Sequence, residues 1–170
     1  MLPASLRVAA LALAVAAGAT AASEDARPAS LECAAARVDY RPFTGRGVDA
    51  DLGRLPRVSA GARRDRLDGF LFYYASAPWA KEGLAAARIY AGGQDPGGAY
   101  AMKILWRAFG HLRTRWLLVS GRRLDAAGSF QQGFRGYGYF PSNVEIPAPG
   151  CWRLDIRAGT GRWALTFLAV

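Results

Sequence analysis

The sequence predicts an all-β protein in which a long irregular N-terminal arm precedes a single β-sandwich. Three observations support this fold class. Short segments alternate between apolar and polar residues, glycine and proline mark turns at intervals of about 8–12 residues, and almost no segment carries a helical period. About seven or eight short strands with this spacing are typical of a sandwich. We therefore expect the arm over residues 22–67 and the sandwich over residues 68–170.

Residues 1–21 have the features of a cleaved secretory signal. Arg7 supplies the positive charge, Val8–Ala17 is the apolar run, and Ala19-Thr20-Ala21 is the small-residue pattern that a signal peptidase cuts. An apolar run of about ten residues is too short for a transmembrane helix, which needs roughly 20. We therefore expect an exported protein, periplasmic or secreted, with no transmembrane segment after cleavage.

The first strands of the sandwich are expected from three segments. Phe70–Tyr74 is short, apolar and aromatic, as a strand buried on both faces would be. Ile89-Tyr90 precedes a glycine-rich turn and indicates the end of a strand. Tyr100–Phe109 alternates, so that Ile104 and Trp106 share one face of the next strand.

The second half of the sandwich is expected from four further segments. Arg115–Ser120 alternates and predicts a strand, and Leu124–Gly128 predicts a turn. Gly133–Pro141 is interpreted as a loop of glycine and aromatic residues, and Val144–Ile146 as a short strand between prolines. A regular hairpin follows, whose inward positions are expected to be Trp152, Leu154, Ile156, Trp163, Leu165 and Phe167.

Three motifs, in order along the chain, carry a resemblance to known proteins. They are Lys103-Ile104-Leu105-Trp106, the turn from Gly121 to Gly128, and Pro149-Gly150-Cys151-Trp152 with the Leu165-Thr166-Phe167 strand after it. Together they resemble the end of a group of uncharacterised exported bacterial proteins. The Pro-Gly-Cys-Trp hairpin also resembles the penultimate strand of immunoglobulin-like sandwiches. The resemblance covers roughly residues 71–170 and implies an immunoglobulin-like antiparallel sandwich, without implying an activity.

The chain has two cysteines, Cys33 and Cys151, and both lie in the part expected to be exported. An even count in an oxidising compartment predicts a disulfide between them. Closing the loop between residues 33 and 151 stabilises the fold by about 4–5 kcal/mol in chain-entropy estimates. The alternative is a metal or redox pair, which needs closely spaced ligands or a Cys-x-x-Cys motif, and neither is present.

The sequence contains no recognisable catalytic, metal-binding or cofactor-binding motif. His111 is the only histidine, and no serine lies in a Gly-x-Ser-x-Gly elbow. Asp49-Ala50-Asp51 lacks the further oxygen ligands of a calcium loop, and no phosphate-binding loop is present. We therefore expect no enzyme activity and no cofactor, although a two-carboxylate hydrolase is kept as an alternative.

The chain is strongly basic, with 22 Lys and Arg against 13 Asp and Glu and a formal charge of +9. Arginine predominates, which suits bidentate contacts with phosphate and carboxylate groups, although a GC-rich genome gives the same composition. Export makes nucleic acid a poor candidate partner. Anionic envelope polymers or lipid head groups are the expected ligand class.

Two sets of residues are candidates for ligand binding. The first is a basic patch of Arg113, Arg115, Arg122 and Arg123, which has Asp125 as the only acid between His111 and Glu145. Lys103 and Arg107 would join it if the flanking strands paired through Phe109–Thr114. The second set lies in the glycine-aromatic loop, where Phe134, Tyr137 and Tyr139 either stack on a ligand or cap the core. The arginines at 63, 64 and 66 are expected to be neutralised by Asp65 and Asp68.

These observations predict an exported, non-catalytic binding protein of the bacterial envelope, with an anionic glycan or lipid as the possible ligand. A first alternative is an accessory or structural subunit of an envelope complex, which would engage protein by strand addition at an open sheet edge. A small envelope hydrolase is a further alternative.

Overall fold

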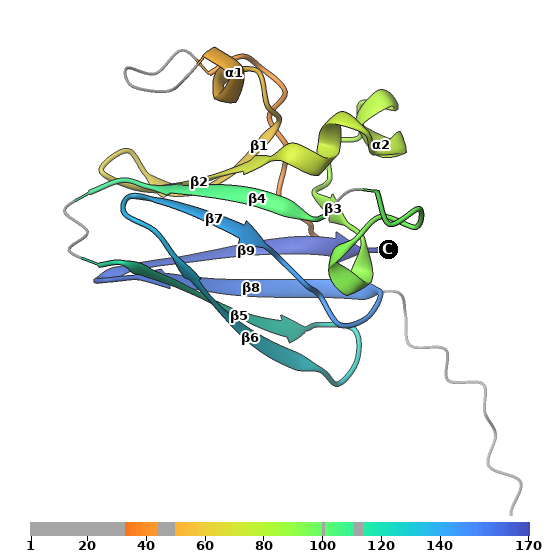
Figure 1. Ribbon diagram of the computed structural model, residues 1–170. Helices are drawn as coiled ribbons and strands as arrows, with labels where there is room; N and C mark the ends of the chain where they lie inside the picture. The colour runs from red at the N-terminus through yellow and green to blue at the C-terminus, as the bar shows by residue number, and fades with distance from the viewer. Residues whose placement is uncertain (1–32, 44–49, 100, 111–113) are drawn as a thin grey trace, which may run out of the picture.

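The structure is a computed structural model that describes residues 33–43, 50–99, 101–110 and 114–170 (Figure 1). The predicted signal peptide and the beginning of the predicted arm lie outside these residues, as do His111 and Arg113. Among the described helices, none has the length and apolar character that crossing a membrane requires.

The described part of the chain is built mainly from strands, with two one-turn α-helices and two 3₁₀ turns. In chain order the elements are α1 (Ala50–Gly53), β1 (Arg57–Ala62), β2 (Asp65–Leu71), a 3₁₀ turn (Phe72–Ala75), α2 (Pro78–Lys81), β3 (Arg88–Ile89), a second 3₁₀ turn (Ala91–Gly93), β4 (Lys103–Ala108), β5 (Trp116–Arg123), β6 (Ser129–Arg135), β7 (Tyr139–Asn143), β8 (Gly150–Ala158) and β9 (Gly161–Ala169).

The strands form two sheets that pack face to face (Figure 1). The first sheet has the order β1-β2-β4-β7 and the second has the order β3-β9-β8-β5-β6. Consecutive strands β4 and β5 lie in opposite sheets, and so do β7 and β8, which is the strand exchange of an immunoglobulin-like sandwich. The predicted fold class is therefore confirmed. One pair, β3 with β9, is parallel, so the second sheet is not wholly antiparallel.

The core lies between the sheets, and its residues follow the expected alternation. Trp152, Leu154 and Ile156 of β8 are buried, and so are Trp163, Leu165 and Phe167 of β9. Trp106 on β4 is fully buried, and its indole Nε1 donates a hydrogen bond to Ser142 Oγ at 3.0 Å. The Ser142 hydroxyl donates in turn to the Ile104 carbonyl at 2.9 Å. The polar atoms of this buried pair are thus satisfied, as a dry core requires.

The predicted boundary between arm and sandwich is wrong, because residue 67 lies inside β2 and β1 lies wholly within the predicted arm. These strands lack a clear apolar alternation. Gly69 occupies an inward position, where an added Cβ would lie 2.6 Å from the Trp106 ring. The large side chain of one strand thus requires a small residue on its neighbour, and this removes the strand signal from the sequence.

The strand predicted after Gly69 is wrong at its end. The strand predicted over Phe70–Tyr74 ends at Leu71, and the 3₁₀ turn that follows buries Tyr73 and Tyr74 instead. Their hydroxyl groups are anchored on Arg88: Tyr73 donates to its carbonyl at 2.8 Å, and Tyr74 accepts from its backbone N–H at 2.7 Å.

The predicted glycine-aromatic loop over residues 133–141 is mostly strand. β6 continues through Arg135 and β7 begins at Tyr139. The predicted strand over residues 144–146 is irregular. There the Gln132 side-chain amide donates to the Glu145 carbonyl at 3.0 Å and accepts from the Glu145 N–H at 3.2 Å. A side chain thus takes the place of a strand partner.

Candidate functional site

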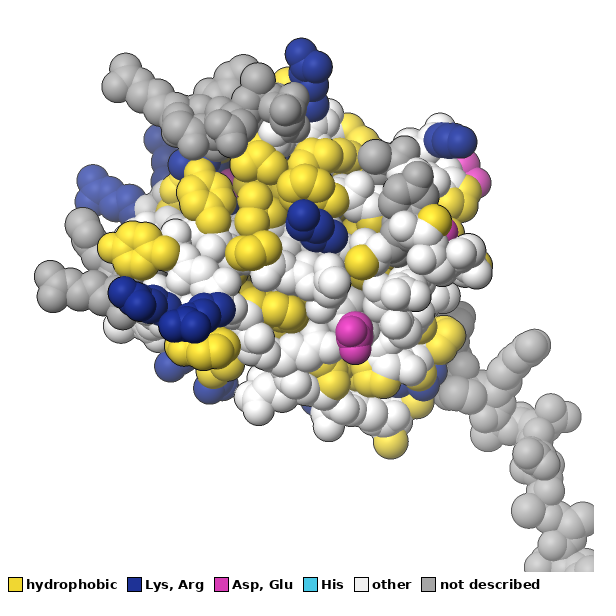
Figure 2. Space-filling model, in the orientation of Figure 1, with side chains coloured by type: hydrophobic (Ala, Val, Ile, Leu, Met, Phe, Trp, Pro, Cys, Tyr) yellow, Lys and Arg dark blue, Asp and Glu magenta, His cyan; other side chains and the backbone are white. Residues whose placement is uncertain are grey.

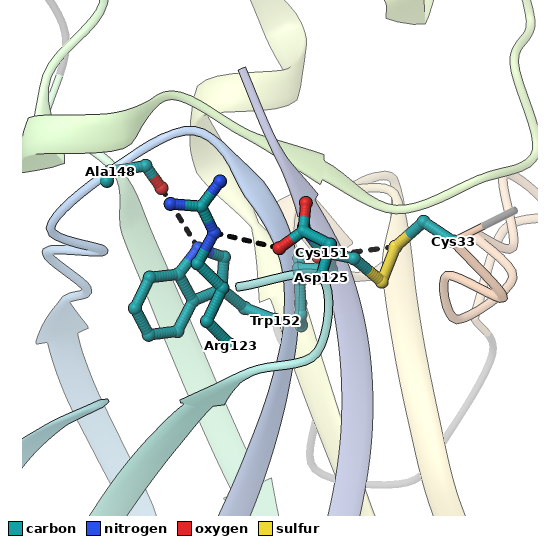
Figure 3. Close-up of a disulfide and its surroundings, with 7 residues drawn as sticks. Cys33, Arg123, Asp125, Ala148, Cys151 and Trp152 are labelled. Atoms are coloured by element: carbon teal, nitrogen blue, oxygen red, sulfur yellow. Dashed lines mark hydrogen bonds and ion pairs between the residues drawn. A yellow bond between two sulfur atoms is a disulfide. The ribbon is translucent and has the colours of Figure 1, made fainter. Parts of the chain in front are cut away.

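The predicted disulfide between Cys33 and Cys151 is present, with the two Cα atoms 5.4 Å apart (Figure 3). Asp125 supports it, because its Oδ2 accepts the Cys151 backbone N–H at 3.1 Å. Arg123 Nε donates to the Asp125 Oδ1 atom at 2.8 Å. This hydrogen bond from Arg123 is the main cause that lowers the pKa of the Asp125 carboxyl below its usual value. Arg123 therefore supports the disulfide turn and is not free to bind a ligand.

Gly150 of the Pro-Gly-Cys-Trp motif lies next to the Arg123–Asp125 ion pair, where the structure requires a glycine. Gly150 has a φ of 137°, and an added Cβ would lie 2.6 Å from Arg123 Nε. The following Trp152 donates from its indole N–H to the Ala148 carbonyl at 2.9 Å (Figure 3). The motif thus fixes the start of β8 and offers no exposed chemistry.

The basic patch predicted from the sequence does not form as a unit. Arg115 precedes the first residue of β5 and Arg122 lies near its last, and seven strand residues span roughly 23 Å. Arg113 lies outside the described residues. Lys103 and Arg107 are on β4 in the first sheet, so the expected pairing of their strand with β5 is also wrong. The chain crosses between the sheets after Phe109 instead of turning within one sheet.

The three aromatic candidates also do not form one binding surface, because they differ in burial and in their contacts. Phe134 is half-buried and packs against the core, as the capping alternative expects. Tyr139 is half-buried, and the Arg107 guanidinium lies 5.4 Å from its ring centroid. Tyr137 is 78 % exposed in the turn between β6 and β7. Of these three rings, Tyr137 is the one that is available to a ligand.

The structure gathers a different set of arginines at one end of the sandwich. The β1–β2, β6–β7 and β8–β9 turns all lie at the left end in Figure 1. Hydrogen bonds join neighbouring segments there: the Gly136 N–H donates to the Arg115 carbonyl at 2.9 Å, and the Trp163 indole donates to the Asp65 carbonyl at 3.0 Å. We call this region the arginine end and define it by its six exposed arginines, Arg63, Arg64, Arg115, Arg135, Arg157 and Arg162.

The charge of the arginine end is not neutralised by the described residues. The ion pairs of the described part of the chain use Asp39, Asp68, Asp125 and Asp155, and none of their partners belongs to the arginine end. Asp65, the first residue of β2, is the only acid in or directly beside the three turns. In Figure 2 dark-blue side chains gather at this left end of the molecule. The expectation of local neutralisation holds for Arg66, which pairs with Asp68, but not for Arg63 and Arg64.

A shallow open pocket of about 480 Å³ lies within the arginine end, lined by Arg115, Arg135, Gly136 and Tyr137. Arg135 faces Trp116 across the β5–β6 pair, and Arg157 faces Arg162 across the β8–β9 pair. Arg135, Arg157 and Arg162 were not among the residues expected from the sequence. The last two could have been found, because both are outward positions that flank a predicted hairpin turn.

A larger open groove of about 800 Å³ lies along the arm, beside Arg37–Pro42, Gly83 and Ala85. Its carboxylate is Asp39, which is bound by Arg41 at 3.0 Å and also by Arg57. The hydrogen bond from Arg41 is the main cause that lowers the pKa of Asp39 to about 2. Because this acid is already ion-paired, the groove offers less unmatched charge than the arginine end.

Within the described ranges, no cluster of three or more histidine, cysteine or acidic side chains is placed to hold a metal ion. No protein-family model, curated protein or solved structure matches the chain. The chemistry of the arginine end therefore carries the functional inference.

Proposed function

We propose that the mature chain is an exported, non-catalytic binding protein of the bacterial envelope, and that its arginine end takes an anionic ligand. One observation carries this proposal. Six exposed guanidinium groups share one end of the sandwich, and none has an ion-pair partner among the residues that the structure describes.

Guanidinium groups suit this role because each presents several N–H donors in a plane. Such a fork binds carboxylate, phosphate or sulfate oxygens with two parallel hydrogen bonds. Unpaired arginines that share one end of a molecule also raise the local concentration of anions through their summed field. The disulfide between Cys33 and Cys151 is compatible with export, since such bonds persist in oxidising compartments.

The proposal is tested by comparing anionic with neutral probes. Polyphosphate and phosphatidylglycerol vesicles should retain the protein, whereas dextran and phosphatidylcholine vesicles should not. Raising the salt concentration from about 0.05 to 0.5 M shortens the screening length roughly threefold and should release most of the bound protein. Equal retention on charged and neutral probes would contradict the proposal.

A pair of charge-reversed variants separates the arginine end from the net charge of the chain. Arg135→Glu/Arg157→Glu should weaken polyphosphate binding by about tenfold or more, because it removes charge-assisted hydrogen bonds. Lys81→Glu/Lys103→Glu changes the net charge by the same amount on exposed residues of α2 and β4, and we expect a loss of no more than about twofold. An equal loss in both variants would overturn the assignment to the arginine end.

One observation favours a second candidate, the accessory subunit of an envelope complex. β6 is the last strand of its sheet among the described residues, and its seven residues contain no proline. An open edge of this length can accept a strand from a protein partner. If the anionic probes fail and Gln131→Pro abolishes capture of an envelope protein, strand addition becomes the better account.

A further inference from the structure

The arginine end also carries apolar side chains on its surface. Trp116 is 53 % exposed, Leu118 is 41 % exposed and Tyr137 is 78 % exposed. The other four tryptophans of the chain are at most 5 % exposed. Trp116 is thus an exposed tryptophan on a strand that is paired on both sides, and packing in the core does not explain its presence there.

The shape of this apolar surface is set by a glycine. Gly133 on β6 lies opposite Leu118, and a Cβ added there would lie 3.4 Å from Leu118 Cδ2 and 3.8 Å from Trp116 Cε3. Both side chains therefore lean across the bare backbone of β6. Together they form an apolar strip on the outer face of the second sheet, over β5 and β6.

Guanidinium groups border this strip across the strands. Arg135 on β6 faces Trp116, Arg157 on β8 faces Leu118, and Arg162 on β9 faces Arg157. From β6 to β9 there are three interstrand spacings, which together span roughly 14 Å. Leu118 thus lies in one row with Arg157 and Arg162, and Trp116 lies beside Arg135 in the next outward row of the same face, so that both apolar side chains have guanidinium neighbours.

We infer that the ligand of the arginine end is an acidic polysaccharide, with a sugar ring packed on Trp116 and its anionic groups bound by Arg135, Arg157 and Arg162. This inference rests on the proposed function. The C–H face of a pyranose ring is apolar and packs on an indole, while carboxylate or phosphate substituents at its edge meet guanidinium forks.

Charge complementarity alone would equally suit an anionic bilayer. The position of Trp116 favours the polysaccharide, because a ring that leans across its own sheet is placed to stack and not to project into lipid. A polymer of rings also matches a binding surface that alternates apolar and cationic groups over several strands.

Fluorescence quenching by acrylamide tests the contact in the unmodified protein. Because the other four tryptophans are buried, the accessible fluorescence should come from Trp116. Polygalacturonate should protect this fluorescence from acrylamide, and dextran should not. Polyphosphate, which has no rings, should protect it much less. Equal protection by polyphosphate and polygalacturonate would overturn the inference.

Affinities of two variants complete the test. Trp116→Ala should weaken binding to polygalacturonate by about tenfold, and binding to polyphosphate by less than about twofold. The control is Leu124→Ala, which truncates an exposed apolar residue in the β5–β6 turn at the opposite end of β5 and should leave both affinities unchanged.

The remaining outcomes separate the two proposals. If Arg135→Glu/Arg157→Glu weakens polyphosphate binding but Trp116→Ala has no selective effect on polygalacturonate, the arginine end binds anions and the polysaccharide inference is wrong. If Trp116→Ala selectively weakens binding to phosphatidylglycerol vesicles instead, the ligand is a lipid surface. If neither arginine nor tryptophan variants change any binding, the proposed function fails as well.

Discussion

The outer faces of the two sheets both combine arginines with aromatic rings, but within the described ranges the arm covers only the outer face of the first sheet. On that face Phe43 from the arm lies 6.2 Å from the buried Phe70 of β2, measured between ring centroids. Gly69 contacts the Trp106 ring inside the sandwich, so the next residue, Phe70, faces outward. On the second sheet Trp116 takes the equivalent outward position and is half-exposed.

The arginines of the two faces differ in the same way. Arg66 on the covered face donates to the fully buried Asp68 at 2.9 Å, and Arg107 lies 4.5 Å from the Phe109 ring centroid. On the open face Arg135 and Arg157 have neither an ion pair nor a stacked ring among the described contacts. The same residue types are thus structural where the arm covers them and available where it does not.

Truncating one aromatic residue on each face should give the largest difference in stability between the covered and the open face. Phe70→Ala should destabilise the protein by about 3–5 kcal/mol, because it empties a buried site beneath Phe43. Trp116→Ala should change the free energy of unfolding by no more than about 0.5 kcal/mol, as surface substitutions do. Urea denaturation of both variants measures the difference. A loss above about 2 kcal/mol for Trp116→Ala would mean that this ring is part of the core.

Removing the disulfide should release the arm that covers the first sheet. We expect Cys33→Ser/Cys151→Ser to destabilise the protein by about 2–5 kcal/mol, because the unfolded chain regains the entropy of an open loop. Reducing the wild-type protein should give a similar loss of stability in the same denaturation experiment. If both losses stay below about 1 kcal/mol, the bond contributes less to folding than its long loop implies.

Removing one arginine from each face gives a smaller contrast. Arg107→Ala should cost about 1–2 kcal/mol, since this guanidinium lies over the rings of Phe109 and Tyr139. Arg157→Ala, on the open face, should stay within about 0.5 kcal/mol of the wild type. Thermal unfolding of the two variants would rank them. The reverse order would show that Arg157 has a structural role.

The smallest expected effect is the loss, at low pH, of the stability that the ion pairs of Asp39 in the arm contribute. The pKa of Asp39 is lowered to about 2, whereas the ordinary pKa of an aspartate is 3.8. Its ion pairs therefore stabilise the folded state fully at pH values above 3.8, and this stability is lost as the pH falls through about 2. The stability difference between wild type and Asp39→Asn should therefore be present at neutral pH and mostly lost near pH 2. We expect it to be below about 1 kcal/mol, because Asp39 is partly exposed. An unchanged difference in acid would contradict this account.

Local alternation made part of this fold and of the candidate site predictable from the sequence. A strand turns successive side chains to opposite faces, so the buried positions of β4, β8 and β9 follow from a few neighbouring residues. In β5 the alternation separates Trp116 from Leu117, but both faces are apolar, and only the structure shows that Trp116 is the outward residue. The single pair of cysteines left one intramolecular disulfide to predict. The 3₁₀ turn after Leu71 was missed, because aromatic residues bury as well in a turn as in a strand when their hydroxyl groups find partners.

Only the tertiary structure decided which arginines meet. The crossing of the chain from β4 to the second sheet separates Arg107 from Arg115, and the length of β5 separates Arg115 from Arg122. Strand pairing brings Arg157 and Arg162 to the same end, while the arm covers Arg66 and Arg107 and leaves Arg135 open. The period of a strand is a local property of the sequence, whereas the cover and neighbours of a side chain depend on contacts between distant segments.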